Sequence, residues 1–347
     1  MDSQSQSQSL LQVRDLNVSF QTYAGQVKAV RGVSFDVGVQ QTLAMVGESG
    51  CGKTVTSKAI MRLLDRSGGK IQEGSQILFQ GQDLLSLSKK QLNQIRGSRV
   101  SMIFQDSMTS LNPTMTVGNQ IMENILTHQK VPKAQARQRA KELLELVEIP
   151  NSELRLKQYP HQLSGGMRQR VMIAIALALN PALLIADEPT TALDVTIQAQ
   201  LMDLLASLKE RFQMSVILVT HDLGIVADFA DKVQVMYAGR IVERGDVADI
   251  FDTPRHPYTW ALLSSIPGRA QASKSKLYSL QGAPPDLLLD LPQCPFAPRC
   301  RYCMPVCKKA IPSQTQISDS HAAACWLLHP MAPAVEPPAG IGGTAHE

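Results

Sequence analysis

The sequence predicts an α/β fold built around a parallel sheet. The runs ALLIADE (182–188) and SVILVTH (215–221) are continuously apolar, which is typical of parallel strands buried on both faces. Between them, QAQLMDLLASLKERF (198–212) has apolar residues at helical spacing. A strand, a helix and a strand in this order form a βαβ unit, and such units build parallel sheets. A further apolar strand, QTLAMVG (41–47), runs directly into a glycine-rich loop.

Length and composition fit a globular chain with a substantial core. Its 347 residues suffice for one large domain with an appendage or for two domains. Hydrophobic residues make up 44% and charged residues 18%, which excludes a disordered chain, and a net charge of +4 is too small to indicate nucleic-acid binding. The N-terminus lacks the features of a secretory signal, and no apolar run reaches the roughly 18 residues of a membrane span. We therefore expect a soluble or peripheral protein in the cytosol.

The remaining segments complete the expected organisation. Alternating stretches between residues 11 and 37 predict antiparallel strands, and VQVMYAGRIVERGD (233–246) predicts a hairpin that turns at Ala238 and Gly239. After about Asp252 prolines become frequent and cysteines appear, which indicates a boundary. We expect a helical subdomain at about 111–165 inside the core domain. The four expected parts are a disordered N-terminus, the core domain, a Cys-containing C-terminal extension and a disordered tail, at residues 1–10, 11–251, 252–330 and 331–347.

The loop GESGCGKT (47–54) carries the clearest chemical signal. It fits the pattern G-x-x-x-x-G-K-[ST], and it lies between a strand and TVTSKAIMRLL (54–64), which has helical spacing. Glycines let successive N–H groups point at phosphate oxygens, Lys53 can reach the β- and γ-phosphates, and the Thr54 hydroxyl can bind Mg²⁺. A chance glycine-rich turn is the alternative, which the flanking strand and helix disfavour. The expected phosphate-binding residues are Gly47, Ser49, Gly50, Cys51, Gly52, Lys53 and Thr54, with Cys51 a tolerated small residue.

Two further motifs suit the same chemistry. LLIADEP (183–189) places two carboxylates at the end of a buried strand, where Asp187 can hold Mg²⁺ and Glu188 can polarise an attacking water. In LSGGMRQR (163–170), Ser164 can cap a helix whose first N–H groups Gly165 and Gly166 leave open to an anion. Taken alone, these residues could be solvated loop acids and a simple helix cap. Beside a phosphate-binding loop, both motifs favour a nucleotide site.

The ordered set of motifs resembles that of ABC-type ATPases. The phosphate-binding loop is followed by LSGGM, by LLIADE and by a strand ending at His221, and the resemblance covers about residues 11 to 250. Gln105 in MIFQD, Asp194 in TALD and His221 in VTHD match the Q-, D- and H-loops of that family. Met167 replaces the commoner glutamine of the signature; we expect little consequence, because backbone groups and Ser164 do most of the phosphate binding.

The resemblance implies a RecA-like core with an antiparallel β subdomain and a helical subdomain, and ATP with Mg²⁺ as cofactors. Two subunits would pack head to tail, with ATP between the phosphate-binding loop of one and LSGGM of the other. Glu188 would be the general base, His221 would hold the γ-phosphate, and Gln105 would sense Mg²⁺ and the attacking water. Asp194 would communicate across the interface. Tyr23 resembles the aromatic residue that stacks on adenine, with Phe20 as the competing candidate.

Finer resemblance points to a subgroup. The stretches 107–121, 159–200 and 255–267 are similar to the ATPase subunits of dipeptide and oligopeptide importers, and nickel importers share much of the pattern. The resemblance implies an ATP-hydrolysing subunit that powers peptide uptake from the cytoplasmic face of the cell membrane. Its partners would be two membrane permeases, a second ABC ATPase expected to be a paralogue, and a solute-binding protein. Nickel or another small solute is the alternative cargo. A soluble ABC ATPase acting on nucleic acid or ribosomes is less favoured, because we see no basic stripe or aromatic platform.

Five of the six cysteines lie in the C-terminal extension, within CPFAPRCRYCMPVC (294–307) and at Cys325. In a reducing compartment such clusters favour metal or redox roles over disulfides. Some members of the peptide-importer subgroup carry a 4Fe-4S cluster here, and zinc or unmetallated thiols are the alternatives. Cys303 falls outside the subgroup pattern and would be a spare thiol. The pattern matches Cys294, Cys300, Cys307 and Cys325.

Overall fold

The computed structural model describes residues 9–64, 67–106, 110–191, 193–266, 280–288, 290–338 and 340–341. Residues 1–8 and 342–347, for which we expected disorder, lie outside this described part, as do residues 107–109 of the importer-like stretch. Contacts divide the chain into two compact units. The first unit comprises residues 1–10, 37–41 and 83–219, and the second comprises residues 11–36, 42–82 and 220–347.

Three parallel strands form the sheet of the first unit. β7 (Val100–Ile103) pairs with β8 (Leu183–Asp187), which pairs with β9 (Ser215–Thr220), and every residue of the three strands is buried. α8 (Val195–Phe212) connects β8 to β9, which confirms the predicted βαβ unit. The helix begins three residues earlier than the periodicity predicts, because Asp194 accepts a hydrogen bond from the Ile197 N–H at 2.9 Å and caps it.

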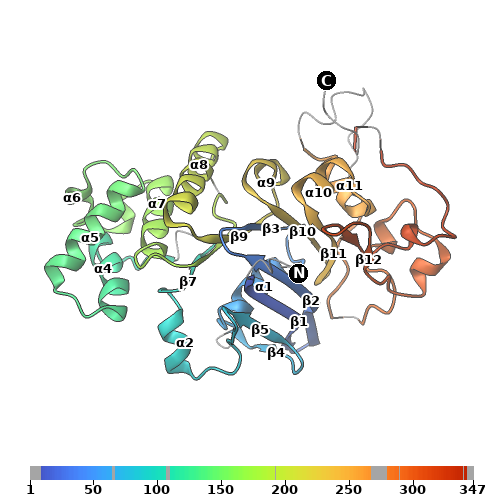
Figure 1. Ribbon diagram of the computed structural model, residues 1–347, viewed down its shortest axis with the longest axis horizontal. Coiled ribbons are helices and arrows are strands. Elements are labelled where there is room, and N and C mark those ends of the chain that lie inside the picture. The colour runs from blue at the N-terminus through green and yellow to red at the C-terminus, as the bar shows by residue number, and fades with distance from the viewer. Residues whose placement is uncertain are drawn as a thin grey trace, which may run out of the picture. The chain divides into compact units, whose positions relative to one another are not determined.

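Helices account for most of the rest of the first unit (Figure 1). The helices at 117–128, 133–146 and 165–176 contact one another in pairs, and they bury apolar side chains such as Ile121, Leu143 and Val171. The predicted helices between residues 111 and 165 are thus confirmed. The helical elements are α2 (Lys89–Ile95), α4 (Val117–His128), α5 (Lys133–Leu146), α6 (Ser152–Arg155), the 3₁₀ turn η2 (Pro160–Gln162) and α7 (Gly165–Ala176).

The second unit contains β3 (Thr42–Val46), the strand that leads into the glycine-rich loop. β3 pairs in parallel with β10 (Lys232–Tyr237), and β10 forms an antiparallel hairpin with β11 (Arg240–Asp246). Ala238 and Gly239 have φ of 48° and 78°, as a tight hairpin turn requires, so the predicted hairpin is confirmed. Two short strands of the extension, β13 (Ala322–Ala323) and β12 (Thr315–Gln316), continue the sheet beyond β11.

An antiparallel sheet also belongs to this part of the chain. Its order is β2–β1–β5–β6, with β4 also paired to β1, and the predicted antiparallel strands are confirmed. α1 (Lys53–Ile60) follows the glycine-rich loop and ends before the predicted Leu64, because Arg62 adopts a left-handed φ of 48°. The strands are β1 (Ser9–Thr22), β2 (Gly25–Gly38), β4 (Gly69–Ile71), β5 (Gln76–Phe79) and β6 (Gln82–Asp83).

The C-terminal extension packs into the core of the second unit. Phe296 lies in one apolar cluster with Tyr237 of β10 and Tyr258 of α11 (Pro257–Leu263), with ring centroids 4.7 to 5.4 Å apart. Such aromatic contacts add stability beyond the area they bury. The helical elements here are α9 (Leu223–Phe229), α10 (Val247–Asp252), α11 (Pro257–Leu263) and the 3₁₀ turns η4 (Ala297–Arg299), η5 (Pro305–Lys308) and η6 (Trp326–Leu328).

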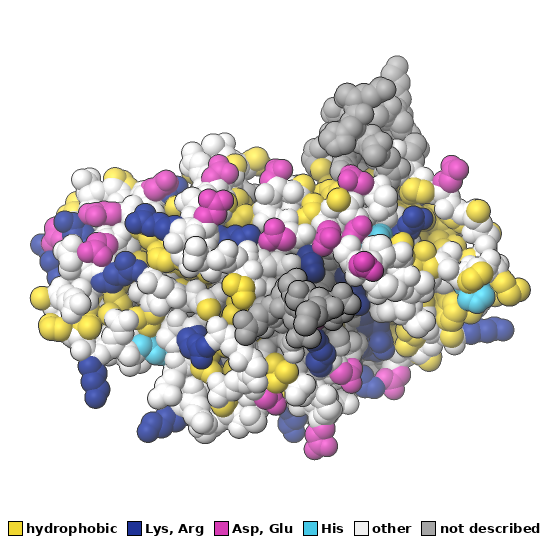
Figure 2. All heavy atoms as spheres, viewed as in Figure 1, with side chains coloured by type: hydrophobic (Ala, Val, Ile, Leu, Met, Phe, Trp, Pro, Cys, Tyr) yellow, Lys and Arg dark blue, Asp and Glu magenta, His cyan; other side chains and the backbone are white. Residues whose placement is uncertain are grey.

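Two surface properties bear on function. No helix in the described ranges combines the length and the apolar character needed to cross a membrane. On the face shown in Figure 2, acidic and basic side chains are interspersed, and no single basic stripe runs across it. A stripe of that kind is the usual footprint of nucleic-acid binding.

Candidate functional site

The glycine-rich loop joins β3 to α1 by a path that only glycine can follow at two points. Gly47 has φ of 148°, and a Cβ there would lie 2.3 Å from the carbonyl oxygen of Met236. Gly52 has φ of 105°, and its Cβ would lie 2.6 Å from the carbonyl oxygen of Ala29. The loop therefore lies directly against the backbone of its own unit, with Ser49 and Gly50 exposed at its tip.

Lys53 is enclosed by this loop. Its side chain is buried, and its ammonium donates to the carbonyl oxygens of Gly47 at 2.7 Å and Glu48 at 3.0 Å. Cys51 lies beside it, with its sulfur 3.8 Å from the Lys53 nitrogen, and burial raises the pKa of this thiol. A buried neutral thiol is a poor nucleophile. Thr54 lies next in the first turn of α1.

Glu48 is held by two residues that lie more than 200 positions further along the chain. Its N–H donates to the Tyr258 hydroxyl at 2.8 Å. Its carboxylate accepts two hydrogen bonds from the guanidinium of Arg299, which lies 251 positions further along the chain. Neither contact was predicted. Periodicity and motif spacing carry no signal for such a distant pair, and Arg299 lies within the cysteine-rich stretch 294–307.

In the first unit, Asp187 and Glu188 lie at the carboxyl end of β8. Asp187 is 1% exposed and is paired in register with Val219. Glu188 has a left-handed φ of 48°, which is uncommon for a residue other than glycine, and its N–H donates to the Val219 carbonyl at 2.9 Å. The Asp187 side chain is buried, whereas Glu188 is half-buried. Strained backbone of this kind concentrates at functional sites.

The structure brings Gln105 and Glu188 together. Gln105 follows β7, and its amide nitrogen donates to a carboxylate oxygen of Glu188 at 2.9 Å. The Thr191 hydroxyl donates to the same oxygen at 3.0 Å. The predicted Q-loop glutamine and the predicted general base thus form one hydrogen-bonded group at the edge of a parallel sheet, where ligands commonly bind. Thr191 was not among the predicted site residues.

The motif LSGGM (163–167) forms a helix N-terminus, as its sequence predicts. Ser164 caps α7 by accepting from the Met167 N–H at 3.4 Å. A Cβ on Gly165 would meet nothing within 4 Å, whereas one on Gly166 would lie 3.3 Å from the Ile197 side chain in the first turn of α8. The N-termini of α7 and α8, the latter capped by Asp194, therefore lie close together. Their N–H groups and helix dipoles favour an anion.

Tyr23 and His221 belong to the second unit. Tyr23 forms the tight turn between β1 and β2, and its ring is fully exposed. Phe20, the competing aromatic residue, is only half-buried but packs close to Gly69 of β4. Tyr23 is therefore the more available ring for stacking. His221 directly follows β9 and is also exposed, and the next residue, Asp222, caps α9.

The five tail cysteines are all free thiols, and they lie close enough to affect one another electrostatically. Burial raises the pKa of Cys294 to about 11 and the pKa values of Cys300 and Cys325 to about 12, with neighbouring thiols adding to each. Cys307 is buried beside them, and its carbonyl accepts from the Cys294 N–H at 2.9 Å. As these side chains lie, no group of three or more His, Cys, Asp or Glu residues in the described chain is arranged to hold a metal ion.

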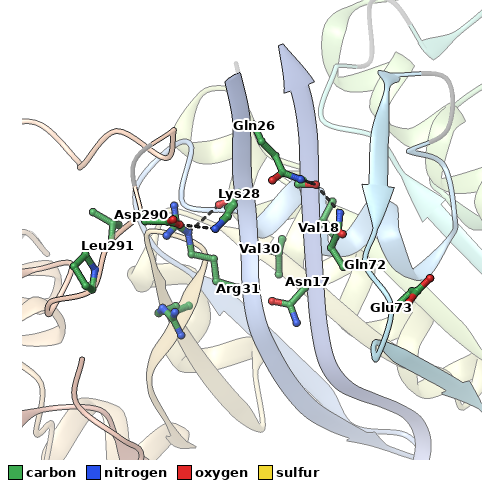
Figure 3. A pocket seen from close by; sticks show the side chains of 13 residues that line it. Asn17, Val18, Gln26, Lys28, Val30, Arg31, Gln72, Glu73, Asp290 and Leu291 are labelled. Atoms are coloured by element: carbon green, nitrogen blue, oxygen red, sulfur yellow. Dashed lines mark hydrogen bonds and ion pairs between the residues drawn. The ribbon is translucent and has the colours of Figure 1, made fainter. Parts of the chain in front are cut away.

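A cavity of about 550 Å³ lies between strands β1 and β2 and residues 290–292 of the extension (Figure 3). Lys28 and Asp290 form an ion pair at its wall, with Arg31 beside them. None of the predicted nucleotide-site residues lines this cavity. This cavity is therefore not the predicted nucleotide site.

Two families match successive parts of the chain. Residues 30–191 match the family described as ABC transporter, and residues 242–307 match the family described as oligopeptide/dipeptide transporter, C-terminal region. The chain is 54% identical to the oligopeptide transport ATP-binding protein OppD of Bacillus subtilis, covering 96% of this chain and 92% of that protein. It is 55% identical to the dipeptide transport ATP-binding protein DppD of Bacillus subtilis, over 92% of this chain and 94% of that protein.

Solved structures show the same fold at lower identity. The chain is similar to the ATP-binding cassette MJ0796, solved as a dimer in a post-hydrolysis state with ADP and Pi, with a TM-score of 0.62 and 26% identity. The similarity covers 68% of this chain and 98% of the cassette. It is also similar to cbiO1 of Clostridium perfringens, part of the ABC transporter complex cbiONQ, with a TM-score of 0.59 and 27% identity, over 70% of this chain and 90% of that one.

Proposed function

The chain belongs to the family of ATP-binding subunits of ABC-type oligopeptide and dipeptide transporters, and we propose that it hydrolyses ATP to power peptide uptake through membrane permeases. The observation that carries this proposal is the continuous similarity to OppD and DppD, which extends from the nucleotide-binding motifs through the C-terminal region. In this proposal the subunit binds to the cytoplasmic face of the membrane. It acts with two permeases, a second ATPase subunit and a solute-binding protein.

Each part of the site has a role in this proposal. The loop around Lys53 binds the phosphates of ATP, and Thr54 and Asp187 hold Mg²⁺, which neutralises negative charge on the phosphates. Glu188 accepts a proton from the attacking water, and its hydrogen bond from Gln105 fixes its orientation. His221 contacts the γ-phosphate.

The paired N-termini of α7 and α8 support a head-to-tail dimer. Ser164, Gly165 and Gly166 would bind the γ-phosphate of ATP held by the partner subunit, because a helix N-terminus offers N–H groups to an anion. Val195, directly after Asp194, is 82% exposed, and a partner subunit at this place would cover it. Closure of such a dimer on ATP would move the helical part of the first unit and the permeases bound to it.

Purification of the tagged chain from membranes tests the proposed assembly. We expect peptide permeases and a second ABC ATPase to co-purify, and we expect deletion of the chain to abolish uptake of a labelled di- or oligopeptide. Restoration of uptake by the wild-type chain would complete the test. Co-purification with nickel permeases, or normal peptide uptake after deletion, would contradict the peptide assignment.

Tyr23 provides a test of the adenine contact. Tyr23→Ala is expected to raise the KM for ATP roughly two- to tenfold, because ring stacking contributes roughly 0.5–1.5 kcal/mol. Tyr23→Phe keeps the ring and should retain the wild-type KM. The measurement is the ATP dependence of phosphate release. Equal KM values for the alanine variant and the wild type would exclude stacking on Tyr23.

We also propose that Cys294, Cys300, Cys307 and Cys325 bind a 4Fe-4S cluster, with zinc as the alternative. Their donor chemistry suits either, since four thiolates satisfy an iron–sulfur cluster or tetrahedral zinc. Besides burial, neighbouring thiols raise the pKa values of Cys294, Cys300 and Cys325, and Cys303 is one of these neighbours, so the choice of the four ligands rests on the subgroup pattern. In the described arrangement no three of these sulfurs form a metal site, so binding would have to draw them together.

Metal analysis of anaerobically purified protein tests this set. We expect iron and acid-labile sulfide, or zinc, to be present in the wild-type protein and to be lost in Cys300→Ser and Cys325→Ser. Cys303→Ser is the matched control and should keep the metal, because Cys303 lies outside the four. If wild-type protein contains neither iron nor zinc, the cysteines are unmetallated thiols. Equal metal loss in Cys303→Ser would show that the ligand set is wrong.

A further inference from the structure

Arg299 of the C-terminal extension reaches into the phosphate-binding loop. Its two terminal nitrogens donate to the two carboxylate oxygens of Glu48, Nη2 to Oε1 at 2.9 Å and Nη1 to Oε2. The Arg299 side chain is 4% exposed and the Glu48 side chain 29%. A fork of two parallel hydrogen bonds between guanidinium and carboxylate fixes both groups in orientation as well as in distance.

Arg299 is itself held from several directions. Its Nε donates to the Gln281 carbonyl at 3.1 Å, Nη1 donates to the Tyr237 hydroxyl at 3.3 Å, and the guanidinium lies 5.8 Å from the centre of the Tyr237 ring. The same ring packs edge-on against Phe296, three residues before Arg299. The arginine is therefore part of a packed core and leaves few other positions for the Glu48 carboxylate.

Glu48 transmits this constraint to the residues that bind phosphate. It directly follows Gly47, whose φ of 148° is open only to glycine, and its carbonyl accepts from the Lys53 ammonium at 3.0 Å. Its N–H donates to the Tyr258 hydroxyl. Side chain, N–H and carbonyl of this one residue are thus all engaged. Two of the three partners, Tyr258 and Arg299, lie C-terminal to residue 250.

The C-terminal extension also contacts β2 of the antiparallel sheet. The Leu287 carbonyl accepts from the Lys28 N–H at 3.1 Å and from Arg31 Nη2 at 3.0 Å. Asp290 pairs with the Lys28 ammonium, and Figure 3 shows Lys28, Arg31 and Asp290 converging at the wall of the cavity beside β2. The residues just before the cysteine-rich stretch are therefore anchored to β2, and Arg299 follows them within that stretch.

We propose that Arg299 is a positioning residue for ATP binding: by holding Glu48 it keeps the phosphate-binding loop in the conformation that receives ATP, and it thereby links nucleotide affinity to the C-terminal extension. The inference rests on the nucleotide site proposed above. A purely structural ion pair is the competing explanation. It predicts a loss of thermal stability with no specific change in the affinity for ATP.

Kinetics of the assembled transporter separate the two explanations. We expect Arg299→Leu to raise the KM for ATP at least about tenfold, since it removes two charge-assisted hydrogen bonds, while kcat at saturating ATP stays within about twofold of the wild type. Arg299→Lys keeps the positive charge but cannot form the two parallel hydrogen bonds. Its KM for ATP should lie between those of the wild type and Arg299→Leu. Arg301→Leu, an exposed neighbour in the extension, is the matched control and should keep the wild-type KM.

A double-mutant cycle identifies the partner. If Arg299 acts through Glu48, then Arg299→Leu combined with Glu48→Gln should raise the KM no further than the larger single effect. A wild-type KM in both Arg299→Leu and Arg299→Lys, with only a lower melting temperature, would overturn the inference. If Arg299→Leu fails to fold, the KM values for ATP of Arg299→Lys and Glu48→Gln decide instead, and wild-type values in both would overturn the inference.

The assignment of the nucleotide site, on which this inference rests, has its own test. Lys53→Ala acts on the nucleotide site and leaves Arg299 in place. If Lys53→Ala abolishes ATP binding and both Arg299 variants keep the wild-type KM, only the positioning role fails. If Lys53→Ala binds ATP normally, the nucleotide-site assignment itself is wrong.

Discussion

Glu188→Gln is expected to bind ATP with near wild-type affinity while its rate of hydrolysis falls about 10²–10⁴-fold. A glutamine oxygen can still accept the hydrogen bonds that Gln105 and Thr191 donate to this position, at 2.9 and 3.0 Å in the wild-type protein. The local geometry should therefore persist. An amide cannot take a proton from the attacking water at neutral pH, so the chemical step loses its base.

This result is measured in the assembled transporter, by phosphate release and by equilibrium binding of ATP in the presence of Mg²⁺. Glu142→Gln is the matched control, because Glu142 is an exposed residue of α5 whose nearest basic partner, Arg139, is 3.8 Å away. It makes the same chemical change in the same unit and should leave turnover unchanged. Full ATPase activity in Glu188→Gln would remove Glu188 from the catalytic role.

The elements that could be predicted from the sequence are those whose local residue pattern is compatible with only one local structure. The strands at 182–188 and 215–221 could be predicted as buried and parallel, because residues 182–186 and 216–219 are apolar without interruption. Gly47 and Gly52 could be assigned to a tight loop, and the structure gives the reason: any side chain at either position would collide with backbone. Ser164 could be assigned as a helix cap from its place before a helical segment, whereas the cap that Asp194 provides for α8 was not predicted.

Contacts between distant segments could not be predicted in this way. The left-handed backbone of Glu188 depends on how β8 leaves the sheet beside β9, and a glutamate by itself does not indicate it. The fork between Arg299 and Glu48 depends on where the extension packs, which a single sequence does not encode in any local pattern. The cysteines illustrate an intermediate case. Their clustering followed from the sequence, but their spacing alone did not fix the arrangement of the sulfurs.

Lys53→Ala is expected to lose most of its affinity for ATP. The Lys53 ammonium is buried, and its hydrogen bonds to the Gly47 and Glu48 carbonyls hold it inside the loop. A hydrogen bond to a charged group contributes roughly 1.5–3 kcal/mol, so losing one such contact to phosphate weakens binding about 10- to 150-fold. The substitution also leaves two loop carbonyls without their donor, which should make the loop less well ordered.

Calorimetric titration with ATP and Mg²⁺ measures this loss, and thermal unfolding of the same samples shows whether the variant remains folded. Lys58→Ala is the matched control, because Lys58 lies in the last turn of the same helix, α1, and outside the loop. Both substitutions remove one positive charge from α1, so a general electrostatic effect would weaken both alike. If Lys53→Ala loses ATP binding and Lys58→Ala keeps it, the loss is due to the ammonium enclosed by the loop and not to the overall charge of α1. An unchanged affinity in a folded Lys53→Ala protein would exclude the glycine-rich loop as the phosphate-binding element.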